Sequence, residues 1–106
     1  VQGAGVELAV LEAGDRARPT VVLVHGYPDT KEVWDLVAAD LALRHHVVRY
    51  DVRGAGASGV PAGDDPWSFE RLEDDLHAVL AATCRPDERV HLVGHDWGGI
   101  QGWRFA

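Results

Sequence analysis

Residues 94–99 read Gly94-His95-Asp96-Trp97-Gly98-Gly99, and they directly follow the apolar run Val90-His91-Leu92-Val93. The stretch has the form G-x-D-x-G, which is that of a nucleophile elbow with a carboxylate in place of the more familiar serine. Glycines on both sides of Asp96 allow a sharp turn from strand to helix, in a conformation that a Cβ would obstruct. We therefore expect Asp96 to be held out from the turn, where it can attack a substrate.

Composition indicates one small globular domain. The chain has 106 residues, of which 46% are hydrophobic, so it can bury a core of modest size. Its 10 basic residues are scattered among 17 acidic ones, giving a net charge of −7, and this balance argues against a nucleic-acid partner. No apolar run approaches the ~18 residues of a membrane span, so we expect no membrane association and a cytoplasmic location. Cys84 is the only cysteine, which excludes an internal disulfide.

Strands and helices are predicted to alternate along the chain. Apolar alternation and short β-branched runs predict strands at residues 6–12, 20–24, 45–50 and 90–93. Apolar residues at helical spacing predict helices that begin at Thr30, after Ser68 as N-cap, and just after Asp96. Such alternation implies right-handed crossovers and a largely parallel sheet covered on both faces, with residues 90–93 as a buried strand. The predicted fold class is therefore α/β.

Three glycine-bearing loops, residues 25–29, 51–59 and 94–99, fall at the carboxyl ends of these strands, where α/β sheets bind ligands. Residues 54–59 lack the G-x-x-x-x-G-K-[ST] pattern, and no G-x-G-x-x-G follows the first strand. We therefore expect neither a nucleotide cofactor nor a metal. The loop from Asp51 to Ser58 is interpreted as structural, with an internal contact between Asp51 and Arg53, and without a contact to substrate.

An aspartate at an elbow selects a different reaction from a serine. A carboxylate with an ordinary pKa near ~3.9 is ionised at neutral pH and needs no base for its first attack. Attack on an ester carbonyl would give an anhydride-like adduct of little advantage, whereas attack on a saturated carbon that bears a leaving group gives an alkyl ester. Water would then hydrolyse that ester at the carboxyl carbon of Asp96. An oxyanion hole must therefore face Asp96.

Two backbone amides are the predicted donors of this oxyanion hole. One is the N–H of Trp97, which follows the nucleophile, and the other is that of Tyr27, in the loop after residues 20–24. Pro28 has no N–H and cannot donate. An alternative remains that residues 25–28 are chosen for backbone shape alone.

Neighbouring aromatic residues are given structural roles. His95 adjoins the nucleophile on a sharp turn, so we expect it to be buried and hydrogen-bonded rather than to act as a base. Trp34 and Trp103 are expected to pack beneath their helices.

Together the motifs His25-Gly26-Tyr27-Pro28, residues 51–58 and residues 94–99 resemble the α/β-hydrolase family, in its epoxide hydrolase branch. The resemblance implies the amino-terminal part of an α/β-hydrolase fold, with Asp96 as nucleophile and the Tyr27 and Trp97 amides as oxyanion hole. It also implies a small apolar epoxide as substrate, a diol as product, and no cofactor. The supporting motif residues are His25, Gly26, Pro28, Gly94, His95 and Gly98.

Haloalkane dehalogenases are the nearest alternative, because they too use an aspartate followed by tryptophan. In that family the position of Tyr27 is typically asparagine, which donates to the halide, so Tyr27 favours epoxide hydrolysis. Fluoroacetate dehalogenases resemble the first motif, but they carry arginine at the position of Trp97.

The remaining catalytic groups of the family have no counterpart in this sequence. The acid, the histidine base and the cap with its tyrosines follow the nucleophile in related proteins, and the sequence ends at Ala106. We therefore interpret residues 1–106 as the amino-terminal part of one α/β-hydrolase domain, with no second domain. The finer resemblance is to bacterial proteins in which a short-chain dehydrogenase/reductase domain follows. A non-catalytic fragment with at most a binding role is the alternative of another class, and the oligomeric state stays open.

Overall fold

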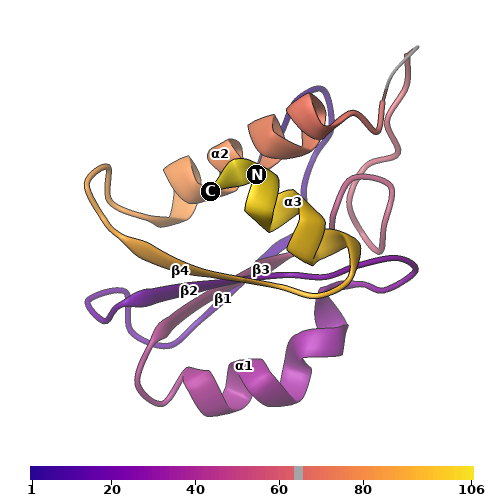
Figure 1. Ribbon diagram of the computed structural model, residues 1–106. Helices are drawn as coiled ribbons and strands as arrows, with labels where there is room; N and C mark the ends of the chain where they lie inside the picture. The colour runs from indigo at the N-terminus through magenta and orange to yellow at the C-terminus, as the bar shows by residue number, and fades with distance from the viewer. Residues whose placement is uncertain (64–65) are drawn as a thin grey trace.

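A four-stranded sheet forms the centre of the protein (Figure 1). The computed structural model describes residues 1–63 and 66–106. The strands lie in the order β1-β3-β2-β4, and their bounds are Val10–Ala13 for β1, Thr20–Val24 for β2, His46–Tyr50 for β3 and Val90–Gly94 for β4. Strands β2, β3 and β4 are parallel, whereas β1 runs antiparallel to β3. The largely parallel sheet predicted from the sequence is thus confirmed.

Helices cover both faces of this sheet (Figure 1). The 3-10 turn η1 (Lys31–Trp34) leads directly into α1 (Asp35–Leu41) on one face. Helices α2 (Phe69–Thr83) and α3 (Trp97–Phe105) lie on the other. The Ser68 hydroxyl accepts a hydrogen bond from the Arg71 amide, so Ser68 is the N-cap of α2 as predicted. None of the described helices combines the length and apolar character needed to cross a bilayer.

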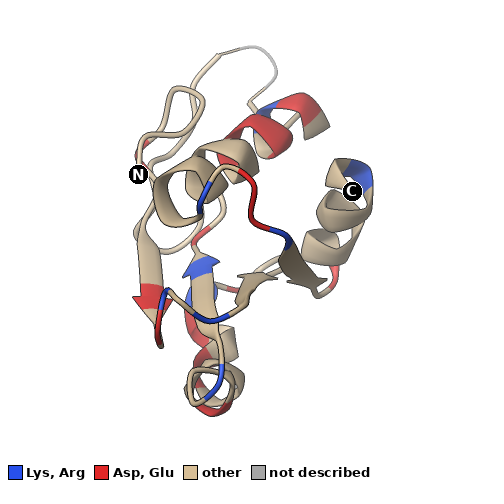
Figure 2. Ribbon diagram, turned by 90° about the vertical axis from the view of Figure 1, so that its left-hand side faces the viewer, with Lys and Arg blue, Asp and Glu red and all other residues tan. Residues whose placement is uncertain are grey.

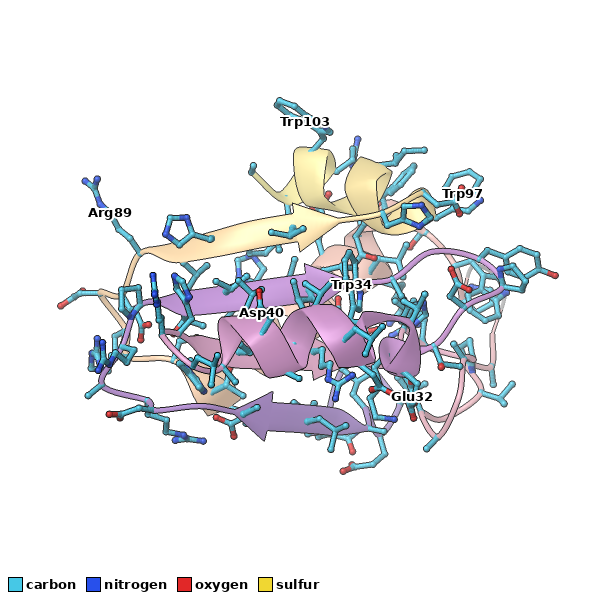
Figure 3. All side chains as sticks on the ribbon, turned by 90° about the horizontal axis from the view of Figure 1, so that it is seen from below. Glu32, Trp34, Asp40, Arg89, Trp97 and Trp103 are labelled. Atoms are coloured by element: carbon cyan, nitrogen blue, oxygen red, sulfur yellow. The ribbon has the colours of Figure 1, made fainter. Side chains whose placement is uncertain are left out.

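Strand β2 is buried along its whole length, as its β-branched sequence predicts for a central strand. Alternate residues point to opposite faces of the sheet and build two core clusters. Val22 and Val24 join β3 and α2 residues in the larger cluster, whereas Val21 and Leu23 pack with Ala38 of α1 in the smaller. Trp34 packs against the smaller cluster, between α1 and the sheet (Figure 3).

The first strand is shorter and later than its predicted range of residues 6–12. Val6 and Leu8 are buried in the larger core cluster, as the alternation indicates, but the paired strand starts at Val10. Alternation of apolar residues predicts which side chains are buried. It does not predict whether the backbone pairs with a strand of the sheet. An extended segment can bury alternate residues without belonging to the sheet.

Strand β4 is partly exposed, which corrects its prediction as a buried strand. It pairs with β2, and no second strand pairs with it within residues 1–63 and 66–106. Val93 is therefore 40% exposed.

Trp103 was predicted to pack beneath α3, and this prediction was wrong. The residue is 85% exposed and its side chain points away from α3 (Figure 3).

Candidate active site

A tight turn at residues 94–99, the predicted place of the elbow, joins β4 to α3. Asp96 has φ 58° and ψ −126°, and in the described part of the chain it is the one residue other than glycine with positive φ. Such a conformation costs about 1–3 kcal/mol and persists only when the surrounding packing enforces it. Gly98 contributes to that packing, because a Cβ placed there would lie 2.1 Å from the carbonyl oxygen of Val24. The turn is thus pressed against the end of β2.

The carboxylate of Asp96 faces two backbone amides. The N–H of Tyr27 donates to Oδ2 of Asp96 over 3.1 Å, and the N–H of Trp97, the next residue, adjoins the same carboxylate. These two amides, first that of Trp97 and then that of Tyr27, hold the pKa of Asp96 below its ordinary value. The side chain is exposed, so it is both ionised at neutral pH and open to a substrate.

The loop after β2 approaches Asp96 closely enough to require glycine at position 26. A Cβ on Gly26 would lie 2.5 Å from the Cβ of Asp96. The next peptide bond, between Tyr27 and Pro28, is cis, and the Tyr27 side chain is 80% exposed. The structure therefore brings together Tyr27, Trp97 and Asp96, the three residues on which the sequence argument depended.

His95 does not match its prediction. It was expected to be buried and hydrogen-bonded, but the structure leaves it exposed beside the elbow. His95 directly follows β4, an edge strand whose one partner in the described part of the chain is β2.

The acidic residue of the second glycine loop binds a lysine rather than an arginine. Oδ2 of Asp51 lies 2.8 Å from Nζ of Lys31, and the backbone amides of Lys31 and Ala57 donate to the same carboxylate. Burial alone would raise the pKa of Asp51, but these hydrogen bonds hold it below its ordinary value. Asp51 thereby ties the loop after β3 to the start of η1.

Arg53 is bound to Asp75 of α2, a helix rich in acidic residues (Figure 2). Both side chains are almost fully buried, and the guanidinium also donates to the carbonyls of Ala4 and Pro66. The predicted internal contact between Asp51 and Arg53 was therefore wrong. Each finds a partner far away in sequence, because the loop lies between η1 and α2.

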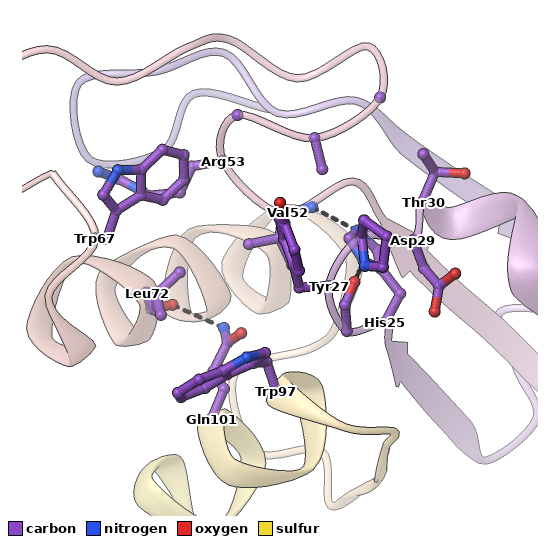
Figure 4. Close-up of a pocket in the computed structure, with 15 residues that line it drawn as sticks. His25, Tyr27, Asp29, Thr30, Val52, Arg53, Trp67, Leu72, Trp97 and Gln101 are labelled. Carbon is purple, nitrogen blue, oxygen red and sulfur yellow. Dashed lines mark hydrogen bonds between the residues drawn. The ribbon is translucent and has the colours of Figure 1, made fainter.

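A cavity of about 540 Å³ opens beside the elbow. Tyr27, Trp67 and Trp97 stand around it, and Leu72 and Gln101 complete the wall towards α2 and α3 (Figure 4). Asp96 does not itself line the cavity, but Tyr27 and Trp97, whose amides adjoin its carboxylate, do.

Five residues of the glycine loop, 52–56, also line this cavity. The loop is therefore part of the candidate site, although the sequence predicts no contact between it and substrate. Trp67, Leu72 and Gln101 also line the cavity, and they were not predicted as site residues. Gln101 donates to the Tyr50 hydroxyl and the Leu72 carbonyl, which joins α3 to β3 and α2. Helical spacing places Leu72 on the face of α2 that points inward, but no sequence signal assigns it to a pocket.

The family model of the alpha/beta hydrolase fold matches residues 19–106. The chain belongs to the α/β-hydrolase fold family. The match includes all three loops around the cavity. No group of three or more His, Cys, Asp or Glu side chains that could hold a metal ion occurs in the described ranges.

Curated relatives of this α/β-hydrolase include proteins named as epoxide hydrolases. The chain is 44% identical over 101 residues to a protein of Mycobacterium tuberculosis named probable oxidoreductase EphD, covering 95% of this chain and 17% of the relative. It is 38% identical over 100 residues to epoxide hydrolase A of the same species, covering 93% of this chain and 30% of that protein. The chain thus spans less than a third of either relative.

Solved structures of epoxide hydrolases also match this chain. The epoxide hydrolase VrEH1 of Vigna radiata superposes with a TM-score of 0.90 at 29% identity, over 99% of this chain and 33% of that one. Epoxide hydrolase A of Mycobacterium thermoresistibile gives a TM-score of 0.89 at 35% identity, again over 99% and 33%.

Proposed function

We propose that these residues supply the nucleophile and the oxyanion hole of an epoxide hydrolase that acts through an alkyl-enzyme ester. One observation carries the proposal: the exposed, ionised carboxylate of Asp96 lies against the amides of Tyr27 and Trp97. The likeness to proteins named as epoxide hydrolases supports the reaction class.

In the first step an oxygen of the Asp96 carboxylate attacks a ring carbon of the epoxide. The bond between that carbon and the ring oxygen breaks, and the ring oxygen takes a proton from an acid. The product of this step is an ester between Asp96 and the substrate. No base is needed, because the carboxylate is already ionised.

In the second step a base takes a proton from water while the water oxygen attacks the carboxyl carbon of Asp96. The tetrahedral intermediate carries its negative charge on an oxygen of the enzyme side chain, within reach of the Tyr27 and Trp97 amides. Collapse of this intermediate breaks the bond between the carboxyl carbon and the substrate oxygen, and that oxygen takes a proton from the protonated base. The diol leaves and the Asp96 carboxylate is restored.

We propose that the base, the acid and the cap belong to a longer protein, of which residues 1–106 are the amino-terminal part. His25 and His46 are buried and hydrogen-bonded, and neither stands free above Asp96. His95 adjoins the nucleophile on its turn. The short share of the relatives' length that this chain covers supports the proposal. Residues 1–106 alone should therefore not complete a catalytic cycle.

Reaction class is tested with the full-length protein and two probes. Styrene oxide should give the diol, whereas 1-chlorobutane should release chloride at least about a hundredfold more slowly. Asp96→Ala should abolish both reactions and serves as the control for contaminating enzymes. Faster release of chloride than of diol would assign the site to dehalogenation, and diol formation by the Asp96→Ala variant would overturn the role of Asp96.

A further inference from the structure

His25 is buried beside the oxyanion loop, with both ring nitrogens engaged. Only 3% of the residue is exposed. Its Nδ1 lies 2.8 Å from the carbonyl oxygen of Gly26, and its Nε2 lies 2.9 Å from the backbone nitrogen of Val52 (Figure 4). The ring thus connects the loop after β2 to the loop after β3.

The two partners fix the protonation state of this ring. A carbonyl oxygen can only accept a hydrogen bond, so Nδ1 must carry the proton that it donates to Gly26. A backbone N–H can only donate, so Nε2 must be unprotonated to accept from Val52. His25 is therefore neutral, in the Nδ1–H tautomer.

The carbonyl that His25 binds belongs to the same peptide unit as the oxyanion donor. The Gly26–Tyr27 peptide has the Gly26 carbonyl at one end and the Tyr27 N–H at the other, and that N–H donates to Asp96. A peptide unit is planar, so a hydrogen bond that fixes its carbonyl also fixes the direction of its N–H. Hydrogen bonds in a chain polarise one another, so donation to the carbonyl also strengthens the N–H as a donor.

We propose that His25 is a positioning residue that orients and polarises the Gly26–Tyr27 peptide for oxyanion stabilisation. This inference rests on the proposed function of Asp96. It assigns His25 a role that a loop chosen only for backbone shape would not have. Asp29 also donates its amide to the Gly26 carbonyl, over 3.0 Å, so His25 reinforces an acceptor that the loop backbone already holds.

A weaker hydrogen bond from the Tyr27 N–H should slow the second chemical step but not the first. In the alkylation step the negative charge of the Asp96 carboxylate is lost, so weaker donation does not slow this step. In the hydrolysis step a new oxyanion forms, so weaker donation does slow it. A general loss of structure would lower both rates or the amount of active enzyme.

Two variants of the full-length protein separate the two hydrogen bonds of the ring. In His25→Asn the side-chain NH₂ occupies the place of Nδ1 and can still donate to Gly26. In His25→Gln the side-chain oxygen takes the place of Nε2 and accepts from Val52, but the donor to Gly26 is lost. Rapid-quench mass spectrometry with styrene oxide measures formation and decay of the Asp96 ester in each variant.

We expect His25→Gln to slow ester decay by about tenfold or more while ester formation is unchanged or faster, and His25→Asn to keep most of the decay rate. Equal decay rates in wild type and His25→Gln would overturn the role of His25. Failure of the wild type to form any ester would instead overturn the proposed function. ¹⁵N NMR of the wild-type histidine ring provides a test independent of both variants: the Nδ1–H tautomer supports the proposal, and the Nε2–H tautomer overturns it.

Discussion

The backbone N–H of Tyr27 donates a hydrogen bond to Oδ2 of Asp96 over 3.1 Å, although 69 positions separate the two residues in sequence. This contact exists because β2 and β4 are adjacent parallel strands, so the loops at their carboxyl ends meet. The candidate site is thus a product of strand order, and it depends on the residues that let the two loops approach.

A substitution at Gly98 tests whether the site requires the close approach of the two loops. In Gly98→Ala the new Cβ would lie 2.1 Å from the Val24 carbonyl, so the elbow must move away from β2. We expect a loss of about 2 kcal/mol or more in the free energy of unfolding, together with loss of activity. Chemical denaturation and diol formation measure the two effects.

Gly99 offers a matched control in the same helix. A Cβ on Gly99 meets no atom closer than 3.6 Å, which is ordinary van der Waals contact. Gly99→Ala should therefore leave activity intact and change stability by less than about 1 kcal/mol. Similar losses in both variants would contradict the close approach of the elbow to β2.

The ion pair between Lys31 and Asp51 should make stability depend on pH. The Lys31 and Asp51 side chains are 9% and 0% exposed, so Asp51→Asn should cost about 3 kcal/mol near neutral pH. The pKa of Asp51 is lowered from 3.8, so its contribution is present above that value and is lost as the pH falls through the lower folded-state pKa. The hydrogen bond to Asp51 raises the pKa of Lys31 from 10.5, so its contribution is present below that value and is lost as the pH rises further.

Chemical denaturation of the wild type and of Asp51→Asn across the pH range measures this pH dependence of stability. The difference in unfolding free energy should be largest between about pH 4 and pH 10 and should shrink on either side. Glu70→Gln, which removes an exposed partner of Arg104, is the control and should change stability by less than about 1 kcal/mol. A difference that stays constant with pH would contradict the assigned charges.

Trp67 should select for substrates with a bulky apolar group. Its indole packs over Gly54, where a Cβ would lie 2.2 Å from the ring, and it forms one wall of the cavity. Trp67→Ala should lower kcat/KM for styrene oxide about tenfold, and for the smaller propylene oxide less than about threefold. Steady-state kinetics of the full-length protein checks this, with the exposed Trp103→Ala as control. Equal losses for both epoxides would remove Trp67 from the substrate wall.

A polypeptide limited to residues 1–106 should not turn over epoxide. It holds the nucleophile, but the proposed base lies outside it. Incubation with styrene oxide and measurement of diol over many equivalents of enzyme tests this. Sustained diol formation would mean that these residues contain a base that we have not recognised.

Much of the site could be predicted from the sequence because its signals are local. The glycines around Asp96 require a tight turn, and the missing N–H of Pro28 leaves Tyr27 as the donor in its loop. The order of strands and helices then implies that these loops meet at one edge of the sheet. In the structure Tyr27, Trp97 and Asp96 lie together, and their catalytic roles stay a prediction.

Features that depend on distant partners could not be predicted in this way. The alternation of Val6 and Leu8 predicts their burial, but it does not show that this segment lies outside the four-stranded sheet. Arg53 binds Asp75, and Asp51 binds Lys31, because helices that the sequence cannot position relative to the loop supply these partners.

A single turnover in H₂¹⁸O shows whether Asp96 forms an ester that water then cleaves at the carboxyl carbon. With full-length enzyme in excess over styrene oxide, mass spectrometry of the diol and of the peptide containing Asp96 locates the label. We expect one ¹⁸O atom in the Asp96 carboxylate and an unlabelled diol. A diol that carries the solvent oxygen, with Asp96 unlabelled, would contradict it.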